Sequence, residues 1–192
     1  MTFVLETTTQ VGVVPRPAAL APSATALRER AIHARHADAI YRFLCDMLGQ
    51  REDAADATQE TFIRAFRQLA TLREPSKEKA WLFGIARNVA REHYRARARR
   101  RDGLAAAPRP EEGGATDPEG ELIGRQTAEA LRRTLRALPS DRRSAFLMRV
   151  DHALAYRDIA AALGWTVAKA KVEVHRARKK LERALMEVED GA

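Results

Sequence analysis

The chain is 192 residues long, which allows one domain or two small ones. Lysine and arginine total 34 against 26 aspartates and glutamates, so the formal net charge is +8, an excess that favours a phosphate-rich partner. The single cysteine, Cys45, excludes an intramolecular disulfide and a multi-cysteine zinc site. No apolar run approaches the roughly 20 residues that span a bilayer, and we expect no secretory signal. We therefore expect a cytoplasmic protein that does not insert into a membrane.

The N-terminal half of the chain is predicted to be helical after a short leader. Residues 1–25 contain several prolines and little hydrophobic periodicity, so we expect them to be disordered. In residues 26–101, apolar residues recur at helical spacing in three segments, of which the first ends near Gly49 and the second covers about residues 52–71. The residues that we expect to form the core of this unit are Phe43, Phe62, Phe66, Trp81 and Ile85.

The helical pattern is interrupted in residues 102–121. Glycines and prolines alternate there with acidic residues, which is typical of a flexible acidic linker. Residues 122–188 resume the helical pattern, with Pro139 ending one helix and Ser140 expected to be the N-cap of the next. Because no segment alternates in the manner of a strand, the sequence predicts an all-α protein of two small helical domains joined by this linker.

A helix-turn-helix pattern occupies the C-terminal part of the second domain. A short apolar-periodic helix ends at Gly164, and the helix that follows carries basic residues away from its apolar face. A glycine turn between two helices, the second of them basic, is typical of the motif that places a helix in the DNA major groove. An ordinary helix pair with a solvated basic face is the alternative. The small Ala160 at the helix crossing and the left-handed stop that Gly164 permits favour the DNA-binding interpretation.

Three acidic residues of the second predicted helix share one face. Asp53, Asp56 and Glu60 lie at steps of three and four residues. Acidic residues collect near a helix N-terminus because the helix dipole favours them there, but Glu60 lies too far along the helix for this explanation. The other interpretation is a docking strip for a basic partner protein, flanked by Gln59 and Phe62. From the residues alone the two interpretations are about equally favoured.

The third predicted helix carries a stripe of arginines. Arg87, Arg91 and Arg95 follow each other at steps of four, and Asn88 lies beside them. Like charges at this spacing disfavour a helix, whereas an arginine stripe with an asparagine suits contact with phosphates and base edges. The aromatic residues of this helix could stack on unpaired bases, although core packing is the favoured interpretation for Trp81. These aromatic residues are Trp81, Phe83 and Tyr94.

Nothing in the sequence argues for catalysis, for a bound metal or for a cofactor. His33 and His36, with Asp38 nearby, resemble a fragment of a metal site, but no second cluster completes it. A surface helix explains these residues better. The sequence contains no glycine-rich phosphate loop and no nucleophile elbow.

Two blocks of sequence resemble bacterial sigma factors. Their conserved region 2 is similar to Asp53-Ala-Ala-Asp-Ala-Thr-Gln-Glu-Thr-Phe-Ile-Arg-Ala-Phe66 and to Trp81-Leu-Phe-Gly-Ile-Ala-Arg-Asn-Val-Ala90. Their region 4 is similar to Leu138-Pro139, Tyr156-Arg-Asp-Ile-Ala160 and His175-Arg-Ala-Arg178. Because only these two regions are found, the chain resembles the small extracytoplasmic-function (ECF) group of the sigma-70 family. The resemblance implies a region 2 helical bundle in residues 26–101 and a four-helix region 4 domain in residues 122–188.

The resemblance also implies partners and site residues. In that family, region 2 docks on the coiled coil of the largest polymerase subunit and opens the −10 promoter element. Region 4 binds the flap of the second-largest subunit and reads the −35 element in the major groove. The resemblance favours the docking interpretation of the acidic strip over the helix-dipole interpretation. The implied core-polymerase contacts are Asp53, Asp56, Gln59, Glu60 and Phe62. The implied −10 contacts are Arg87, Asn88, Arg91 and Arg95. The implied −35 contacts are Lys169, Lys171, Val172, His175 and Arg176.

The second helix of the helix-turn-helix pair departs from the family pattern. Where the family often has a Thr-Val-Lys-Ser-Arg run, this chain has Lys169-Ala-Lys-Val-Glu173, so the −35 sequence cannot be taken from relatives. Glu173 stands where the family commonly has an arginine, and it would repel phosphate or accept a hydrogen bond from a cytosine amine.

We expect a promoter-specificity subunit of RNA polymerase that needs no cofactor and is not an obligate homo-oligomer, with an anti-sigma factor as a further candidate partner. The alternatives are a dimeric helix-turn-helix regulator, a metal-dependent helical hydrolase that uses His33, His36 and Asp38, and, more weakly, an RNA-binding adaptor.

Overall fold

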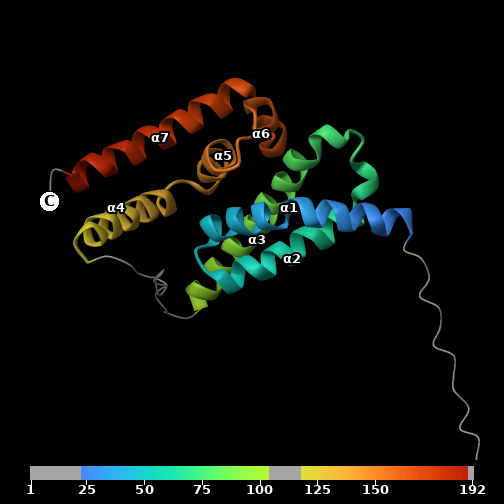
Figure 1. The fold of residues 1–192 in the computed structure, drawn as a ribbon, viewed down its shortest axis with the longest axis horizontal. Helices are drawn as coiled ribbons and strands as arrows, with labels where there is room; N and C mark the ends of the chain where they lie inside the picture. The colour runs from blue at the N-terminus through green and yellow to red at the C-terminus, as the bar shows by residue number, and fades with distance from the viewer. Residues whose placement is uncertain (1–22, 104–117, 190–192) are drawn as a thin grey trace, which may run out of the picture.

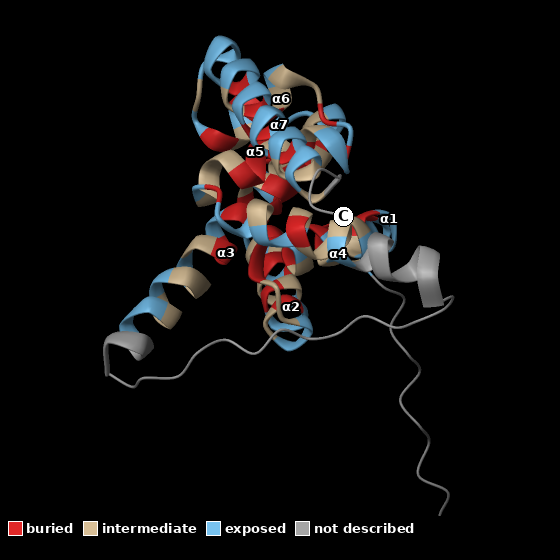
Figure 2. Ribbon diagram, turned by 90° about the vertical axis from the view of Figure 1, so that its left-hand side faces the viewer, coloured by how far each residue is buried: buried red, intermediate tan, exposed pale blue. Residues whose placement is uncertain are grey.

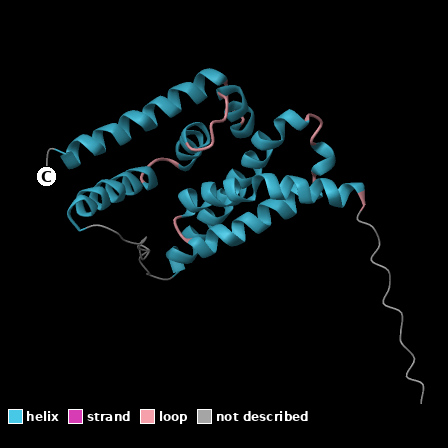
Figure 3. Ribbon diagram, in the orientation of Figure 1, coloured by secondary structure: helices cyan, strands magenta, loops and turns pink. Residues whose placement is uncertain are grey.

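The computed structural model describes residues 23–103 and 118–189, and in this part of the chain all regular structure is helical (Figures 1 and 3). The predicted all-α class is therefore confirmed. Short 3₁₀ turns at Leu69–Thr71 and Pro75–Lys77 connect the second and third helices. The helices are α1 (Ala24–Leu48), α2 (Arg51–Arg67), α3 (Glu78–Gly103), α4 (Pro118–Arg136), α5 (Ser140–Val150), α6 (Tyr156–Leu163) and α7 (Val167–Glu189).

Local sequence signals explain most of the helix ends. The Ser23 side chain accepts a hydrogen bond from the Ala26 amide at 3.2 Å and so caps the start of α1. Gly49 and Gly164 end α1 and α6 with φ of +77° and +65°, a conformation that glycine adopts without strain, as predicted. The expectation that Ser140 is an N-cap is wrong. Ser140 is the first residue of α5, and Pro139 occupies the cap position.

The helices extend into both ends of the segment that we expected to be a linker. α3 continues to Gly103, and α4 already begins at Pro118. Proline is tolerated in the first turn of a helix because the amide hydrogen that it lacks has no partner there, so a proline in this segment does not exclude a helix. α1 likewise begins at Ala24, inside the leader that we expected to cover residues 1–25, so that expectation is wrong for its last residues. Residues 104–117 and 1–22 lie outside the described part of the chain, and the flexible linker and the disordered leader stay predictions for them.

α1, α2 and α3 pack together as a first helical unit around a core that the sequence largely predicts (Figure 2). Of the five expected core residues, Phe43, Phe62 and Ile85 are buried, whereas Phe66 and Trp81 are partly buried and pack against the core. Phe83 is fully buried, with its ring centroid 5.1 Å from that of Phe43. The suggestion that Phe83 could stack on bases is therefore wrong for this structure.

α4 to α7 form a second helical unit, in which α4 lies along α7 while α5 and α6 lie nearer to the first unit (Figure 1). The inner face of α7 is made by Ala170, Val174 and Ala177, all of which are buried. Ala160 of α6 is also buried, as expected for a small residue at a close helix crossing.

The two units are packed directly against each other. α6 lies on α3, where a Cβ added to Gly84 would stand 3.4 Å from the carbonyl oxygen of Ala162. His152, in the turn between α5 and α6, lies with its ring centroid 4.6 Å from that of Phe83 and 6.0 Å from that of Phe43. Buried residues of both units belong to one continuous hydrophobic core. Within residues 23–103 and 118–189, no helix has the length and apolarity that crossing a membrane requires.

Candidate nucleic-acid interface

The turn between α6 and α7 is built to present α7 at the surface. After Gly164, the Trp165 amide donates to the Ala160 carbonyl at 2.8 Å, which closes the end of α6. The Thr166 side chain then accepts a hydrogen bond from the Lys169 amide at 3.2 Å and caps the start of α7. Since Ala170 and Val174 anchor the inner face of α7, the outer face of its first turns is fixed toward solvent.

The five residues predicted to read the −35 element lie together on this outer face. Residues four positions apart on a helix share a face, as Lys171 does with His175 and Val172 with Arg176. The Lys169 ammonium also lies 4.7 Å from the centre of the Trp165 ring, a cation–π contact that holds its side chain near the turn. Exposed in this structure are Lys169, Lys171, Val172, His175 and Arg176.

Glu173 does not share that outer face. Only 14% of its side chain is exposed, and its two carboxylate oxygens are held by two arginines. Arg142 of α5 donates to Oε2 at 2.5 Å, and Arg176 donates to Oε1 at 2.9 Å. These hydrogen bonds, that of Arg142 first, hold the pKa of Glu173 below its ordinary value. The sequence did not predict this inward orientation.

Three of the four residues predicted to contact the −10 element line one groove. Asn88 and Arg95 are exposed, Arg91 is half-buried, and all three border a groove of about 640 Å³ between α3 and α6. Trp81 of α3 and Ala162 of α6 also line this groove. The groove therefore combines cationic groups, an amide and an aromatic ring on one side of α3.

Arg87, the fourth predicted −10 contact, lies elsewhere. It is 8% exposed, and its Nη2 and Nε atoms donate to Oδ1 of Asp141 on α5 at 2.6 and 3.1 Å. Its Nη1 donates to the Asn88 side chain at 2.9 Å. The stripe that we inferred from steps of four residues is therefore divided, because α5 covers its first member.

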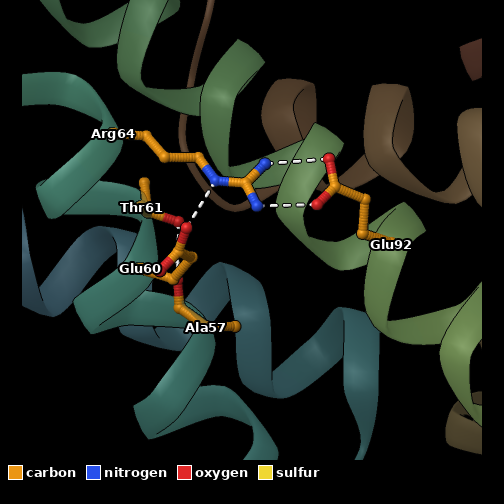
Figure 4. Close-up of polar contacts among 5 residues, drawn as sticks. All are labelled: Ala57, Glu60, Thr61, Arg64 and Glu92. Atoms are coloured by element: carbon orange, nitrogen blue, oxygen red, sulfur yellow. Dashed lines mark hydrogen bonds and ion pairs between the residues drawn. The ribbon is translucent and has the colours of Figure 1, made fainter. Parts of the chain in front are cut away.

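The acidic strip on α2 is partly neutralised by arginines. Arg64 donates from Nε to Glu60 at 2.6 Å and from Nη1 and Nη2 to both oxygens of Glu92 on α3 at 2.8 and 2.7 Å (Figure 4). This bidentate hydrogen bond from Arg64 lowers the pKa of Glu92. Asp53 lies 3.9 Å from the guanidinium of Arg97 on α3. The strip thus also joins α2 to α3.

Asp56 and Gln59 are the exposed members of the predicted core-polymerase contact. Phe62 is 4% exposed. Its ring centroid lies 4.6 Å from that of His33 and 5.8 Å from that of Phe66. In this structure Phe62 therefore belongs to the core and offers no surface to a partner. The helical period alone did not separate it from the exposed face, because it lies at the border of the acidic strip.

The expected surface position is confirmed for His33 and Asp38, which are exposed, but is wrong for His36. His36 is 8% exposed, and its Nε2 lies 2.8 Å from Glu78 Oε1, which also accepts a hydrogen bond from Arg35 at 2.6 Å. This contact joins α1 to the start of α3. Among the described residues, no three histidine, cysteine or acidic side chains are grouped as a metal site would require.

The contacts between the two units involve residues that sequence reasoning missed. Arg143 of α5 is 6% exposed and donates to the Met47 carbonyl and the Tyr94 hydroxyl, both at 2.8 Å. Burial lowers the pKa of this guanidinium. Lys79 donates to the His152 carbonyl at 2.5 Å. No local pattern distinguishes these cations from solvated ones, because the partners that join the two units lie at least 49 residues away in the chain.

Comparison with known proteins identifies both units. Residues 32–100 match the family model of Sigma-70 region 2, and residues 128–181 match that of Sigma-70, region 4. The chain is 33% identical over 150 residues to the ECF RNA polymerase sigma factor SigE of Mycolicibacterium smegmatis, a match that covers 77% of this chain and 57% of that protein. It is 31% identical over 154 residues to the RNA polymerase sigma-H factor of Pseudomonas aeruginosa, covering 76% of this chain and 78% of that protein.

Solved structures agree with this assignment. The sigma factor RpoE in complex with the anti-sigma factor NepR from Bartonella quintana is similar with a TM-score of 0.63 at 26% identity, over 82% of this chain and 96% of that one. CnrH in complex with the cytosolic domain of CnrY has the same fold, with a TM-score of 0.60 at 23% identity over 83% and 88% of the two chains. This chain therefore belongs to the sigma-70 family, in its extracytoplasmic-function group, and is a promoter-recognition subunit that acts with core RNA polymerase in transcription initiation.

Proposed function

We propose that this chain reads the −35 element with the outer face of α7 and the −10 element with the groove between α3 and α6. The observation that carries the proposal is the arrangement of α7. Its inner face is buried against α5 and α6, whereas Lys171, Val172, His175 and their neighbours are exposed together. An α-helix that is anchored in this way fits the major groove, where lysines contact phosphates and side chains meet base edges.

The groove beside α3 suits single-stranded DNA. Its arginines, Arg91 and Arg95, can track phosphates, Asn88 can hydrogen-bond a base edge, and Trp81 offers part of an aromatic face. Arg87 can join them only after Asp141 releases it, because both Nε and Nη2 are engaged in this structure. We therefore propose that α5 and α6 move away from α3 when the chain engages polymerase and promoter together.

The proposed polymerase contact is the exposed part of α2. Asp56 and Gln59 are exposed, and Asp53 and Glu60 are partly exposed beside them. The acidic groups would meet a basic surface of core polymerase and would steer association by charge complementarity. Phe62 is left out of this contact because it is buried. The chain would act through binding, with no catalysis of its own, in the cytoplasm where the polymerase works.

An anti-sigma factor is a further proposed partner. The similar Bartonella quintana structure is that of a sigma factor in complex with an anti-sigma factor, and the similarity covers 82% of this chain. A protein that held α5 and α6 on α3 would keep Arg87 on Asp141. Such binding would prevent the movement that promoter engagement requires.

Run-off transcription from a library of random promoters tests the proposal. Core polymerase is assayed with and without the chain, and new start sites that share two upstream motifs are expected only when the chain is present. The combined substitution of Lys171 and His175 by alanine should remove the upstream motif, whereas the same change at Lys179 and Lys180, further along α7, is the matched control. A chain that shifts duplex DNA as a dimer and yields no new transcripts would instead be a conventional helix-turn-helix regulator.

A further inference from the structure

Glu173 lies in α7, the helix that we propose reads DNA, but its side chain is turned away from the exposed face toward Arg142 of α5. It sits between Ala170 and Val174 of the buried face and the exposed Val172 and Arg176, and 14% of its side chain is exposed. A carboxylate in this helix would weaken DNA binding if it faced the phosphates, because like charges repel. The structure avoids this arrangement by turning Glu173 toward α5.

Both carboxylate oxygens of Glu173 already have partners. Oε2 accepts from Arg142 at 2.5 Å, and Oε1 accepts from Arg176 at 2.9 Å. A carboxylate that reads a cytosine must accept a hydrogen bond from the base amine on the open side of the helix. With its oxygens on the two arginines and most of its side chain covered, Glu173 is poorly placed for that contact.

Arg176 is placed differently. Its side chain is 60% exposed, and Glu173 takes a hydrogen bond from its Nη1. A guanidinium has five N–H donors, so the contact with Glu173 leaves donors for a base or a phosphate. The same contact reduces the number of conformations that the long arginine side chain samples. Less conformational entropy is then lost when the guanidinium meets a base.

Arg142 completes the arrangement. It comes from α5, the helix before the helix-turn-helix pair, and 27% of its side chain is exposed. The hydrogen bond that Arg142 donates, more than its charge, holds the pKa of Glu173 below its ordinary value. The chain Arg142–Glu173–Arg176 therefore connects the supporting helix to the reading face of α7.

We propose that Glu173 is a positioning residue for promoter recognition, which orients the Arg176 guanidinium toward one base pair of the −35 element and so sets the preference for that base pair. The inference rests on the proposed function of α7. It assigns base contact to Arg176 and support to Glu173, in contrast to a Glu173 that reads a base itself or that only repels phosphate.

The test uses holoenzyme formed from core polymerase and the full chain, with promoter DNA whose −35 element is randomised. Bound DNA is sequenced to obtain the preference at every base pair. Arg176→Ala should reduce the preference at one base pair by roughly 5- to 100-fold, the range that one bidentate contact provides. Glu173→Gln should reduce the preference at the same base pair by roughly 3- to 10-fold, because the contact remains but is less well oriented. Glu182→Gln removes an exposed acid from the same helix and is the matched control.

The double variant Glu173→Gln with Arg176→Ala separates a positioning role from a general structural one. If Glu173 acts through Arg176, the double variant should have the same base preferences as Arg176→Ala alone. Thermal unfolding of each variant, followed by circular dichroism, establishes that the folded chain is being compared.

Other outcomes would overturn the inference. A change at a different base pair in Glu173→Gln would mean that Glu173 reads a base directly. If Glu173→Gln and Glu182→Gln had the same base preferences, Glu173 would not position Arg176 and would affect DNA binding only through its charge. If the unchanged chain selected no −35 motif at all, the proposed function of α7 would fail, and this inference would fail with it.

Discussion

The Arg87 guanidinium on α3 donates two hydrogen bonds to a single oxygen of Asp141 on α5, at 2.6 and 3.1 Å. This contact joins the region 2 unit to the region 4 unit. It also places a predicted DNA contact inside the protein, since only 8% of Arg87 is exposed. The chain in this structure is therefore in an arrangement in which Arg87 is unable to reach promoter DNA.

We expect Asp141→Asn to lower the free energy of unfolding by about 1 kcal/mol, because it weakens the partner of a buried cation. The effect should be smaller than the roughly 3–5 kcal/mol typical of fully buried pairs, since 37% of the Asp141 side chain is exposed. Urea unfolding of both chains measures the difference. Asp38→Asn, at an exposed position of α1, is the control and should change the midpoint little. Equal midpoints for Asp141→Asn and the unchanged chain would mean that the pair does not stabilise the packed arrangement.

A large side chain at position 84 should loosen the packing of α6 on α3, whereas a small one should not. The Cβ of an alanine would lie 3.4 Å from the Ala162 carbonyl oxygen, which is an ordinary contact, whereas a leucine would have to displace α6. We expect Gly84→Ala to leave the packing intact and Gly84→Leu to increase amide hydrogen exchange throughout α6. Because α3 would keep its own core contacts, exchange in α1 and α2 should change much less. Equal exchange of α6 in the two variants would argue against the close packing of α3 and α6.

The packed arrangement should weaken in mild acid because of His152. Burial, with repulsion from Lys79 and Arg42, lowers the pKa of His152 to about 4 from an ordinary value of 6.5. As the pH falls below about 6.5, the unfolded chain binds a proton that the folded chain binds only near pH 4, so stability decreases with falling pH. Above about pH 6.5, His152 causes no loss of folding free energy. Near pH 4 the loss reaches at most about 3 kcal/mol.

His152→Gln removes this titration and isolates it from other groups. We expect the free energy of unfolding of the variant to fall less steeply than that of the unchanged chain between about pH 6.5 and pH 4.5. Lys79 can keep its hydrogen bond in the variant, because it donates to the main-chain carbonyl of residue 152. Parallel pH profiles for the two chains would assign the acid sensitivity to other groups.

Asp56→Lys should weaken binding to core polymerase. Asp56 is exposed on α2, and a lysine there would face the basic surface that we propose as its partner. Because Asp56 is an exposed charge and the substitution replaces an attraction by a repulsion, we expect the dissociation constant to rise by about tenfold, which is about 1.4 kcal/mol. Fluorescence anisotropy of the labelled chain, titrated with core polymerase, measures this change. Asp38→Lys makes the same charge change on α1, and an equal loss in that variant would mean that only the total charge matters.

Much of the architecture followed from local signals in the sequence. Gly49 and Gly164 end helices because the left-handed conformation at these positions favours glycine. The helix-turn-helix pair was predictable from the spacing of buried positions such as Ala170 and Val174, which a helix repeats every three to four residues. The acidic face of α2 was predictable for the same reason. Periodicity thus determined which helices form and which outer faces carry charge.

Tertiary packing alone decided how those faces are used. Arg87 and Arg95 belong to one stripe when only steps of four residues are considered, but α5 covers the first and leaves the second exposed. In the sequence Glu173 is one more charge on the helix that we predict to read DNA, yet in the structure it faces inward to Arg142, 31 residues earlier in the chain. Helical periodicity reports only what one helix repeats along its own length. The contacts that bury Arg87 and orient Glu173 depend on a second helix, whose position is set by the packing of the whole core.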